Sequence, residues 1–76
     1  MSDTTTPIRR FEFVEVNSKK FWEIAVSGTK VRVNFGRIGT NGQGVIKSFF
    51  DEAAATKHAD KVVKEKLAKG YFEVPV

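Results

Sequence analysis

Hydrophobic and polar residues alternate along the first half of the chain, which is the pattern of half-buried β-strands. The alternation is clearest in residues 30–35, where Val31, Val33 and Phe35 would share one face of a strand. Similar segments, rich in aromatic and β-branched residues, are separated by turn residues. The pattern therefore predicts four strands, at residues 10–16, 20–26, 30–35 and 43–50.

The hydrophobic period changes after Phe50, and residues 51–69 are predicted to form a helix. Asp51 is suited to cap the first turn, because its carboxylate can accept hydrogen bonds from free backbone N–H groups. Alanine and long-chain residues fill the body of this segment, and Gly70 is suited to end it. The remaining residues 71–74 are long enough for a final short strand.

The element order β-β-β-β-α-β predicts an α+β fold. We expect one small domain, residues 9–76, in which a twisted antiparallel sheet carries a single C-terminal helix on one face. Residues 1–8 are expected to be a disordered lead. A domain this small needs most of its large apolar side chains inside. We therefore expect most aromatic residues in the core, namely Phe11, Phe13, Trp22, Phe49, Phe50, Tyr71 and Phe72.

The stretch NFGRIGTNGQG, residues 34–44, is rich in glycine, as are many loops that cradle phosphate. A dinucleotide-binding fingerprint needs G-x-G-x-x-G before a helix, and a P-loop needs G-x-x-x-x-G-K-[ST]. Neither pattern is present, and the next predicted element is a strand. The pair Asn41-Gly42 favours a hairpin turn with positive φ. The stretch is therefore predicted to join the third and fourth strands.

The triplet Phe35-Gly36-Arg37 stands at the end of the third predicted strand. Strict alternation would point Arg37 to the same side as Phe35, whereas a bulge at Gly36 would turn it elsewhere. An aromatic ring beside a guanidinium can stack on a base or sugar and hold a phosphate. The alternative interpretation is a core phenylalanine followed by a solvated arginine.

The net charge of +4 and the pI of about 9.6 come mainly from the middle of the chain. Residues 17–50 contain six basic residues and the single acid Glu23, whereas residues 51–70 contain five lysines and four acids. A basic segment concentrates polyanions. We infer phosphate contacts for Lys20, Arg32 and Lys47 from this local charge; the alternative is that the charge serves solubility alone.

Little in the composition supports chemistry, secretion or membrane insertion. The chain has no cysteine, no apolar run long enough to span a membrane and no apolar signal segment, so we expect a cytoplasmic protein. His58, the single histidine, has no further ligands at useful spacing, so no metal is expected. No paired carboxylates or activated hydroxyl are apparent. We therefore expect no enzymatic activity, no cofactor and no small-molecule substrate.

Three segments in this order, NSKKFWEI, VNFGRIGTNGQ and EKLAKGY, resemble the WGR domain family over about residues 10–73. That family takes its name from a Trp-Gly-Arg signature in the strand that corresponds here to residues 31–38. The chain departs from the signature because Phe35 replaces the tryptophan. The resemblance implies an α+β fold with an antiparallel sheet and a helix, and it suggests a small stand-alone bacterial protein.

The resemblance also implies a non-enzymatic nucleic-acid-binding module, with DNA strand ends or breaks as the expected ligand. In that reading Phe35 would stack, Arg37 would make the polar contact, and Asn17 would match an asparagine of the family. Phenylalanine keeps a flat apolar face but lacks the indole N–H of tryptophan. The alternative function is a protein–protein interaction module that uses the same sheet surface or an edge strand.

Overall fold

The computed structural model describes residues 7–76, so most of the lead expected at residues 1–8 lies outside the described part of the chain. Five strands and one helix follow in the predicted order. They are β1 (Arg9–Glu15), β2 (Ser18–Ser27), β3 (Lys30–Arg37), β4 (Gln43–Ser48), α1 (Glu52–Ala68) and β5 (Phe72–Val74). The predicted fold class is confirmed.

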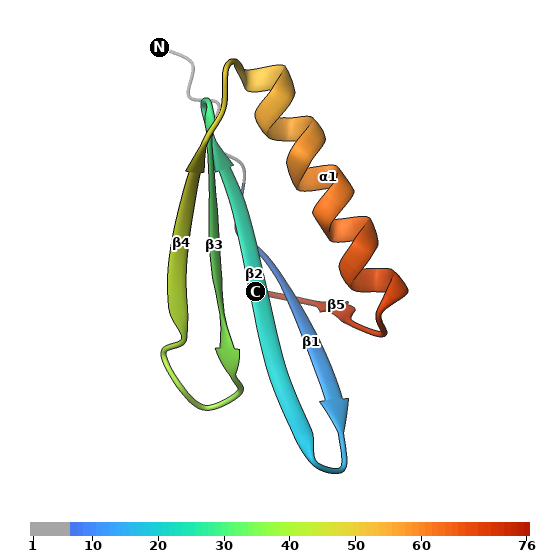
Figure 1. Ribbon diagram of the computed structural model, residues 1–76. Coiled ribbons are helices and arrows are strands. Elements are labelled where there is room, and N and C mark those ends of the chain that lie inside the picture. Colours follow the sequence, from blue (N-terminus) through green and yellow to red (C-terminus); the bar gives the residue numbers. More distant parts are fainter. Residues whose placement is uncertain (1–6) are drawn as a thin grey trace.

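The strands form one antiparallel sheet in the order β4-β3-β2-β1-β5, and α1 lies along one face of it (Figure 1). We call this face the helix side. The opposite face, which we call the open side, is covered by no other helix or strand of residues 7–76. The two faces therefore meet different environments, although every strand contributes to both.

The core lies between the sheet and α1 and consists of two matched sets of side chains. The strands contribute aromatic and branched residues, among them Phe11 and Trp22, whose rings lie 5.7 Å apart. The helix contributes small residues at a spacing of four, Ala55, Ala59 and Val63. Because these side chains are short, the helix backbone can approach the sheet closely and bury the large residues beneath it.

The two ends of α1 are formed as the sequence predicts. The side chain of Asp51 accepts a hydrogen bond of 2.8 Å from the N–H of Ala54. At the other end Gly70 has φ of 103°, a conformation that favours glycine. It allows the N–H of Tyr71 to reach the carbonyl of Lys66 and so closes a Schellman motif.

The glycine-rich stretch joins β3 to β4, as predicted, and folds back over the open side. Its residues cover Phe21, which is buried although it points away from the helix. A Cβ on Gly42 would lie 2.6 Å from the Phe21 ring, and a Cβ on Gly36 would lie 2.8 Å from the Gly42 Cα. These two glycines are therefore required for backbone packing, which gives Gly36 a structural role.

Two details of the predicted structure were wrong. Phe50 is 97% exposed, because β4 ends at Ser48 and the link to the capped helix carries Phe50 away from the core. Phe72 is half exposed, because it pairs with Glu12 and so points to the open side, where no element of the described chain covers it. Strand ends elsewhere moved by one or two residues.

The interlocked glycines lead to a stability prediction. Gly36→Ala should destabilise the fold by roughly 1–3 kcal/mol, because the added methyl group would press on the backbone of Gly42. Gly44→Ala is the matched control, since a Cβ there has only the carbonyl of Val33 at 4.0 Å. Urea unfolding of both variants measures the difference; equal stabilities would contradict the packing role.

Candidate nucleic-acid interface

Phe35 lies on the helix side of β3, directly opposite Trp22 of β2. The two rings differ sharply in burial, since Trp22 is 4% exposed and Phe35 is 38% exposed. The Phe35 side chain is thus neither fully buried in the core nor fully exposed to solvent. Its exposed part can receive a flat ligand, while its position beside the core holds it in place.

Arg37 lies two residues further along β3 and faces the same side as Phe35. The pairing of β2 with β3 runs without interruption from Ser27↔Lys30 to Lys20↔Arg37, so there is no bulge at Gly36 to turn Arg37 away. Its direct neighbour across the strands is Lys20, another cation. Neither side chain forms an ion pair with any residue of the described chain.

The pairing geometry places these two residues on closely spaced backbone positions, while the Lys20 ammonium itself lies 5.3 Å from the ring of Phe13 on β1. The N–H of Ile38 donates to the carbonyl of Lys19, which makes that pair a hydrogen-bonded one. Because such pairs alternate, Lys20 and Arg37 form a non-hydrogen-bonded pair, in which side chains approach more closely. Like charges in this arrangement are destabilising, so the site is one that an anion would relieve.

A third cation reaches this surface from the helix. The ammonium of Lys66 lies 5.5 Å from the ring of Trp22 and 5.2 Å from that of Tyr71, so its stem covers the aromatic core. Burial lowers the pKa of Lys66, and the charges of Lys69 and Lys20 lower it further, whereas Glu65 opposes the change. We call Lys20, Phe35, Arg37 and Lys66 the helix-side cluster.

Lys66 is not among the site residues that the sequence predicts. The missing information was tertiary, because residues 20 and 66 come together only when α1 packs on the sheet. A weak signal was present, since a lysine at a core-facing helix position has a reason to reach beyond the core. Lys69 caps the same, C-terminal end of the helix and adds to the positive charge near Lys66.

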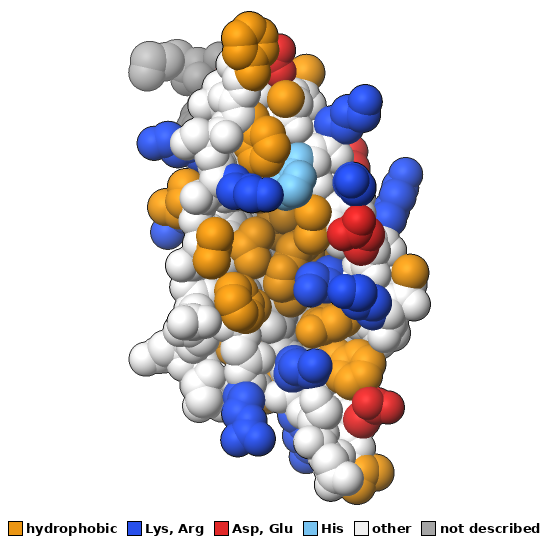
Figure 2. All heavy atoms as spheres, viewed as in Figure 1, with side chains coloured by type: hydrophobic (Ala, Val, Ile, Leu, Met, Phe, Trp, Pro, Cys, Tyr) orange, Lys and Arg blue, Asp and Glu red, His pale blue; other side chains and the backbone are white. Residues whose placement is uncertain are grey.

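Figure 2 shows the helix side as an apolar band between the helix and the strands, with lysine and arginine side chains around it. Val33 is packed against the core, and Val45 of β4 is 47% exposed. Lys47 faces the same side, because it pairs with the buried Val31. It stands at the far end of β3 from Arg37, roughly 20 Å away at the rise of a strand.

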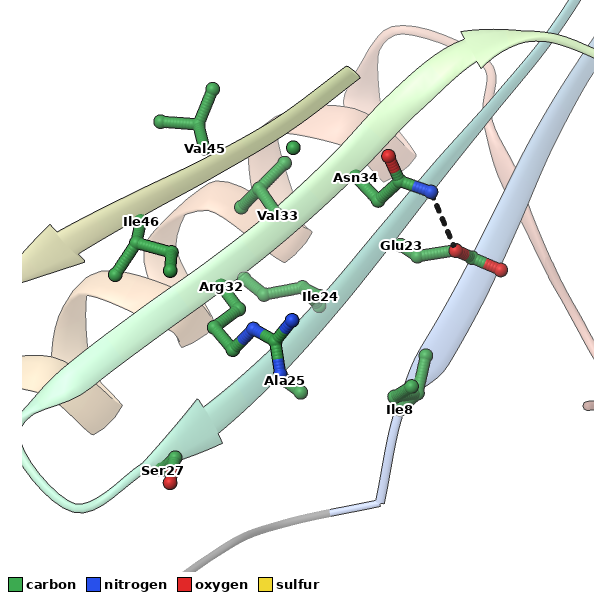
Figure 3. Close-up of a pocket in the computed structure, with 11 residues that line it drawn as sticks. Ile8, Glu23, Ile24, Ala25, Ser27, Arg32, Val33, Asn34, Val45 and Ile46 are labelled. Carbon is green, nitrogen blue, oxygen red and sulfur yellow. Dashed lines mark hydrogen bonds between the residues drawn. The ribbon is translucent and has the colours of Figure 1, made fainter. Parts of the chain in front are cut away.

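The other predicted site residues lie elsewhere. Arg32 points to the open side, where it lines a shallow groove with Ala25 and Ile46 (Figure 3). Asn17 is exposed in the turn between β1 and β2. The structure therefore brings Lys20, Phe35 and Arg37 together, keeps Lys47 on the same face at a distance, and separates Arg32 from them.

The described residues offer no arrangement typical of catalysis. No group of three potential metal ligands occurs among residues 7–76. His58 is half buried against Phe49, with ring centres 4.8 Å apart, so its surroundings are aromatic. The most enclosed carboxylates are used in structural pairs, as in Glu23 with Arg10 at 2.9 Å. No helix in the described part is long and apolar enough to cross a membrane.

Comparison with known proteins decides which family this arrangement represents. The WGR domain family model matches residues 8–75, nearly the whole chain. The chain belongs to the WGR domain family. WGR domains are nucleic-acid-binding modules and act in binding rather than in catalysis. The predicted family is thereby confirmed.

Individual relatives support the same assignment. YehF of Escherichia coli (strain K12) is 41% identical over 66 residues, and YfeS of the same organism is 37% identical over 67 residues. These matches cover 87% and 88% of this chain but only 24% and 28% of the relatives. The WGR domain therefore spans about a quarter of the length of the relatives it matches.

A solved structure shows the same fold at closer identity. The crystal structure of a Bacteroides fragilis protein matches this WGR domain with a TM-score of 0.89 and 45% sequence identity. The match covers 91% of this chain and 20% of that protein. This fold therefore also occurs as one part of a larger protein.

The opposed cations lead to a prediction about stability. Arg37→Gln should stabilise the domain slightly at low salt, by roughly 0.2–1 kcal/mol, because it removes repulsion with Lys20. The gain should vanish at high salt. Arg32→Gln is the matched control, because its neighbours across the strands are Ala25 and Ile46. Thermal melts at two salt concentrations test this; a loss of stability in Arg37→Gln would contradict it.

Proposed function

We propose that this WGR domain binds DNA at strand ends through the helix-side cluster. The observation that carries the proposal is the pairing of Lys20 with Arg37 on neighbouring strands beside the half-exposed Phe35. Neither cation has an ion-pair partner in the described chain, and the Lys20 ammonium lies 5.3 Å from the ring of Phe13. A sheet gains nothing in stability from such a pair. Binding of a phosphate between the two side chains would offset the repulsion and explain the arrangement.

The chemistry of the cluster suits a nucleotide better than a simple anion. The guanidinium of Arg37 can hold phosphate oxygens with two parallel N–H donors, whereas Lys20 acts as a point charge. The exposed face of Phe35 can stack on a base or sugar, and a strand end offers such a face without unstacking a duplex. In the family signature Phe35 takes the place of tryptophan, so stacking is retained and the indole N–H contact is lost.

Further positive charge extends the surface in two directions. Lys69, the residue that caps the C-terminal end of α1, lies near Lys66 of the cluster, and Lys47 stands at the far end of the apolar band. The spacing of these groups allows contacts to several phosphates along a backbone. We expect three to four phosphate contacts, which correspond to a slope of log K against log salt of roughly −3. These contacts carry no base specificity.

Asn17 and Arg32 hold lesser places in the proposal. Asn17 lies in the exposed β1–β2 turn and can meet a ligand only if the ligand extends past Lys20. Arg32 faces the open side and does not belong to the proposed interface. The alternative, a protein-interaction function, would use the free edge of the sheet at β4.

The first binding test compares two arginines of the same strand. Arg37→Gln should weaken binding to a labelled duplex about tenfold and reduce the salt slope by about one. Arg32→Gln should change affinity less than about threefold, because it retains only long-range attraction to the ligand. Fluorescence anisotropy at several salt concentrations measures both. Equal losses in the two folded variants would refute an interface confined to the helix side.

The second test addresses the strand end. We expect a blunt duplex with open ends to bind more tightly than a duplex of equal length whose ends are closed by hairpins. Phe35→Ala should remove this preference while leaving most of the salt dependence, because stacking rather than charge is lost. Thermal melts confirm that the variant is folded. Equal binding of both duplexes by the wild-type domain would exclude end recognition.

A further inference from the structure

β4 is the edge strand of the sheet beyond β3, and its outer row of backbone groups has a defined identity. The N–H of Phe49 donates to the carbonyl of Thr29 directly opposite, at 2.8 Å. Because hydrogen-bonded and non-hydrogen-bonded pairs alternate in an antiparallel ladder, Val45 and Lys47 direct their backbone groups toward β3. The N–H and carbonyl groups of residues 44, 46 and 48 therefore point outward.

This edge lacks most of the devices that prevent strand addition. Native edges are commonly blocked by proline, by a bulge or by inward-pointing charges. β4 contains neither a proline nor a bulge in its pairing with β3, and its one protective feature is Lys47, whose side chain lies on the helix side. All of its residues are exposed, including Val45 on the helix side and Ile46, 59% exposed, on the open side. Apart from Lys47, the edge is therefore open to another strand.

The residues near the β4 edge favour a negatively charged partner strand. Residues 24–50 contain no acid, so β3, β4 and the turn between them carry only neutral or basic side chains. Glu23 of β2 lines the groove on the open side, but it is paired with Arg10. Lys30 and Arg32 of β3, the strand next to β4, lie on the open side and form no ion pair with any described residue. Arg32 borders the groove that Ile46 and Ile8 line with apolar surface (Figure 3).

We propose that the β4 edge binds an extended segment of a partner protein in which apolar and acidic residues alternate. Its backbone would pair with residues 44, 46 and 48, and its carboxylates would meet Lys30 and Arg32 on the open side. A nucleic acid would suit the charge alone, but donors and acceptors that recur about every 6.8 Å fit a second peptide backbone. The carboxylate contacts lie on the open side, away from the helix-side cluster, and only Lys47 of β4 also borders the proposed DNA surface. The proposal therefore does not depend on the proposed DNA binding.

The experiment uses a synthetic probe peptide in which valine and glutamate alternate over about eight residues, the length of an ordinary strand. We expect measurable binding by anisotropy, with slowed hydrogen exchange at the amides of Gly44, Ile46 and Ser48. Two control peptides are matched to it. One carries lysine in place of glutamate, and the other has the same sequence with N-methyl groups on alternate amides. Both should bind at least about tenfold more weakly, since they lose charge pairing or backbone pairing.

Two variants of the protein separate the backbone from the charge. Ile46→Pro removes one outward N–H, which proline tolerates on an edge strand, so the fold should survive. It should abolish peptide binding and leave DNA binding unchanged, because Ile46 faces the open side. Arg32→Gln should weaken the acidic peptide roughly three- to fivefold. Thermal melts and DNA anisotropy show that each variant is folded.

Three results would overturn the proposal. The first is no binding of the glutamate peptide by the wild-type domain, and the second is equal binding of the N-methylated peptide. The third is a dimer of the domain alone in sedimentation that Ile46→Pro dissociates, which would identify a second copy as the occupant of the edge.

Discussion

The register of β2 against β3 is the constraint on which both the core and the candidate site depend. It places Trp22 opposite Phe35 and Lys20 opposite Arg37. Because side chains alternate along a strand, a slip by one residue would move all of these groups to the other face. The register therefore keeps the large apolar residues beneath the helix and, in the same step, assembles the cationic pair. The core and the site cannot change independently at these positions.

The single helix makes the two faces of the sheet unequal, and the structure responds differently on each. On the helix side, small residues of α1 allow a tight core, with the helix-side cluster at its margin. On the open side, Phe21 would be exposed, but the β3–β4 connection folds over it and the guanidinium of Arg10 lies 4.5 Å from its ring. The glycine-rich stretch thus packs over the open side of the sheet. Because Gly36 fits under it without a side chain, β3 continues without a bulge from Phe35 to Arg37.

Much of the fold could be predicted from the sequence because its signals are local. Strand alternation, the Asp51 cap and the Gly70 stop each depend on a few neighbouring residues, and the structure has all three. The solvent exposure of Phe50 and Phe72 could not be predicted from such local signals. Both are aromatic and were expected inside, but only the end of β4 and the pairing of β5 with β1 decide that they face solvent.

The candidate site also has some features that the sequence predicts and others that depend on the fold. Strict alternation along one strand predicts from the sequence that Phe35 and Arg37 share a face, and the pairing of β2 with β3 excludes the alternative of a bulge at Gly36. The sequence by itself also determined that the basic residues concentrate in the middle of the chain. Which cations lie near one another depends on the tertiary structure. Strand pairing places Lys20 opposite Arg37, and the packing of α1 on the sheet adds Lys66. The pleat of β3 directs Arg32 to the opposite face. The meeting of Lys20, Arg37 and Lys66 depends on contacts between residues far apart in the chain, which local sequence patterns do not specify.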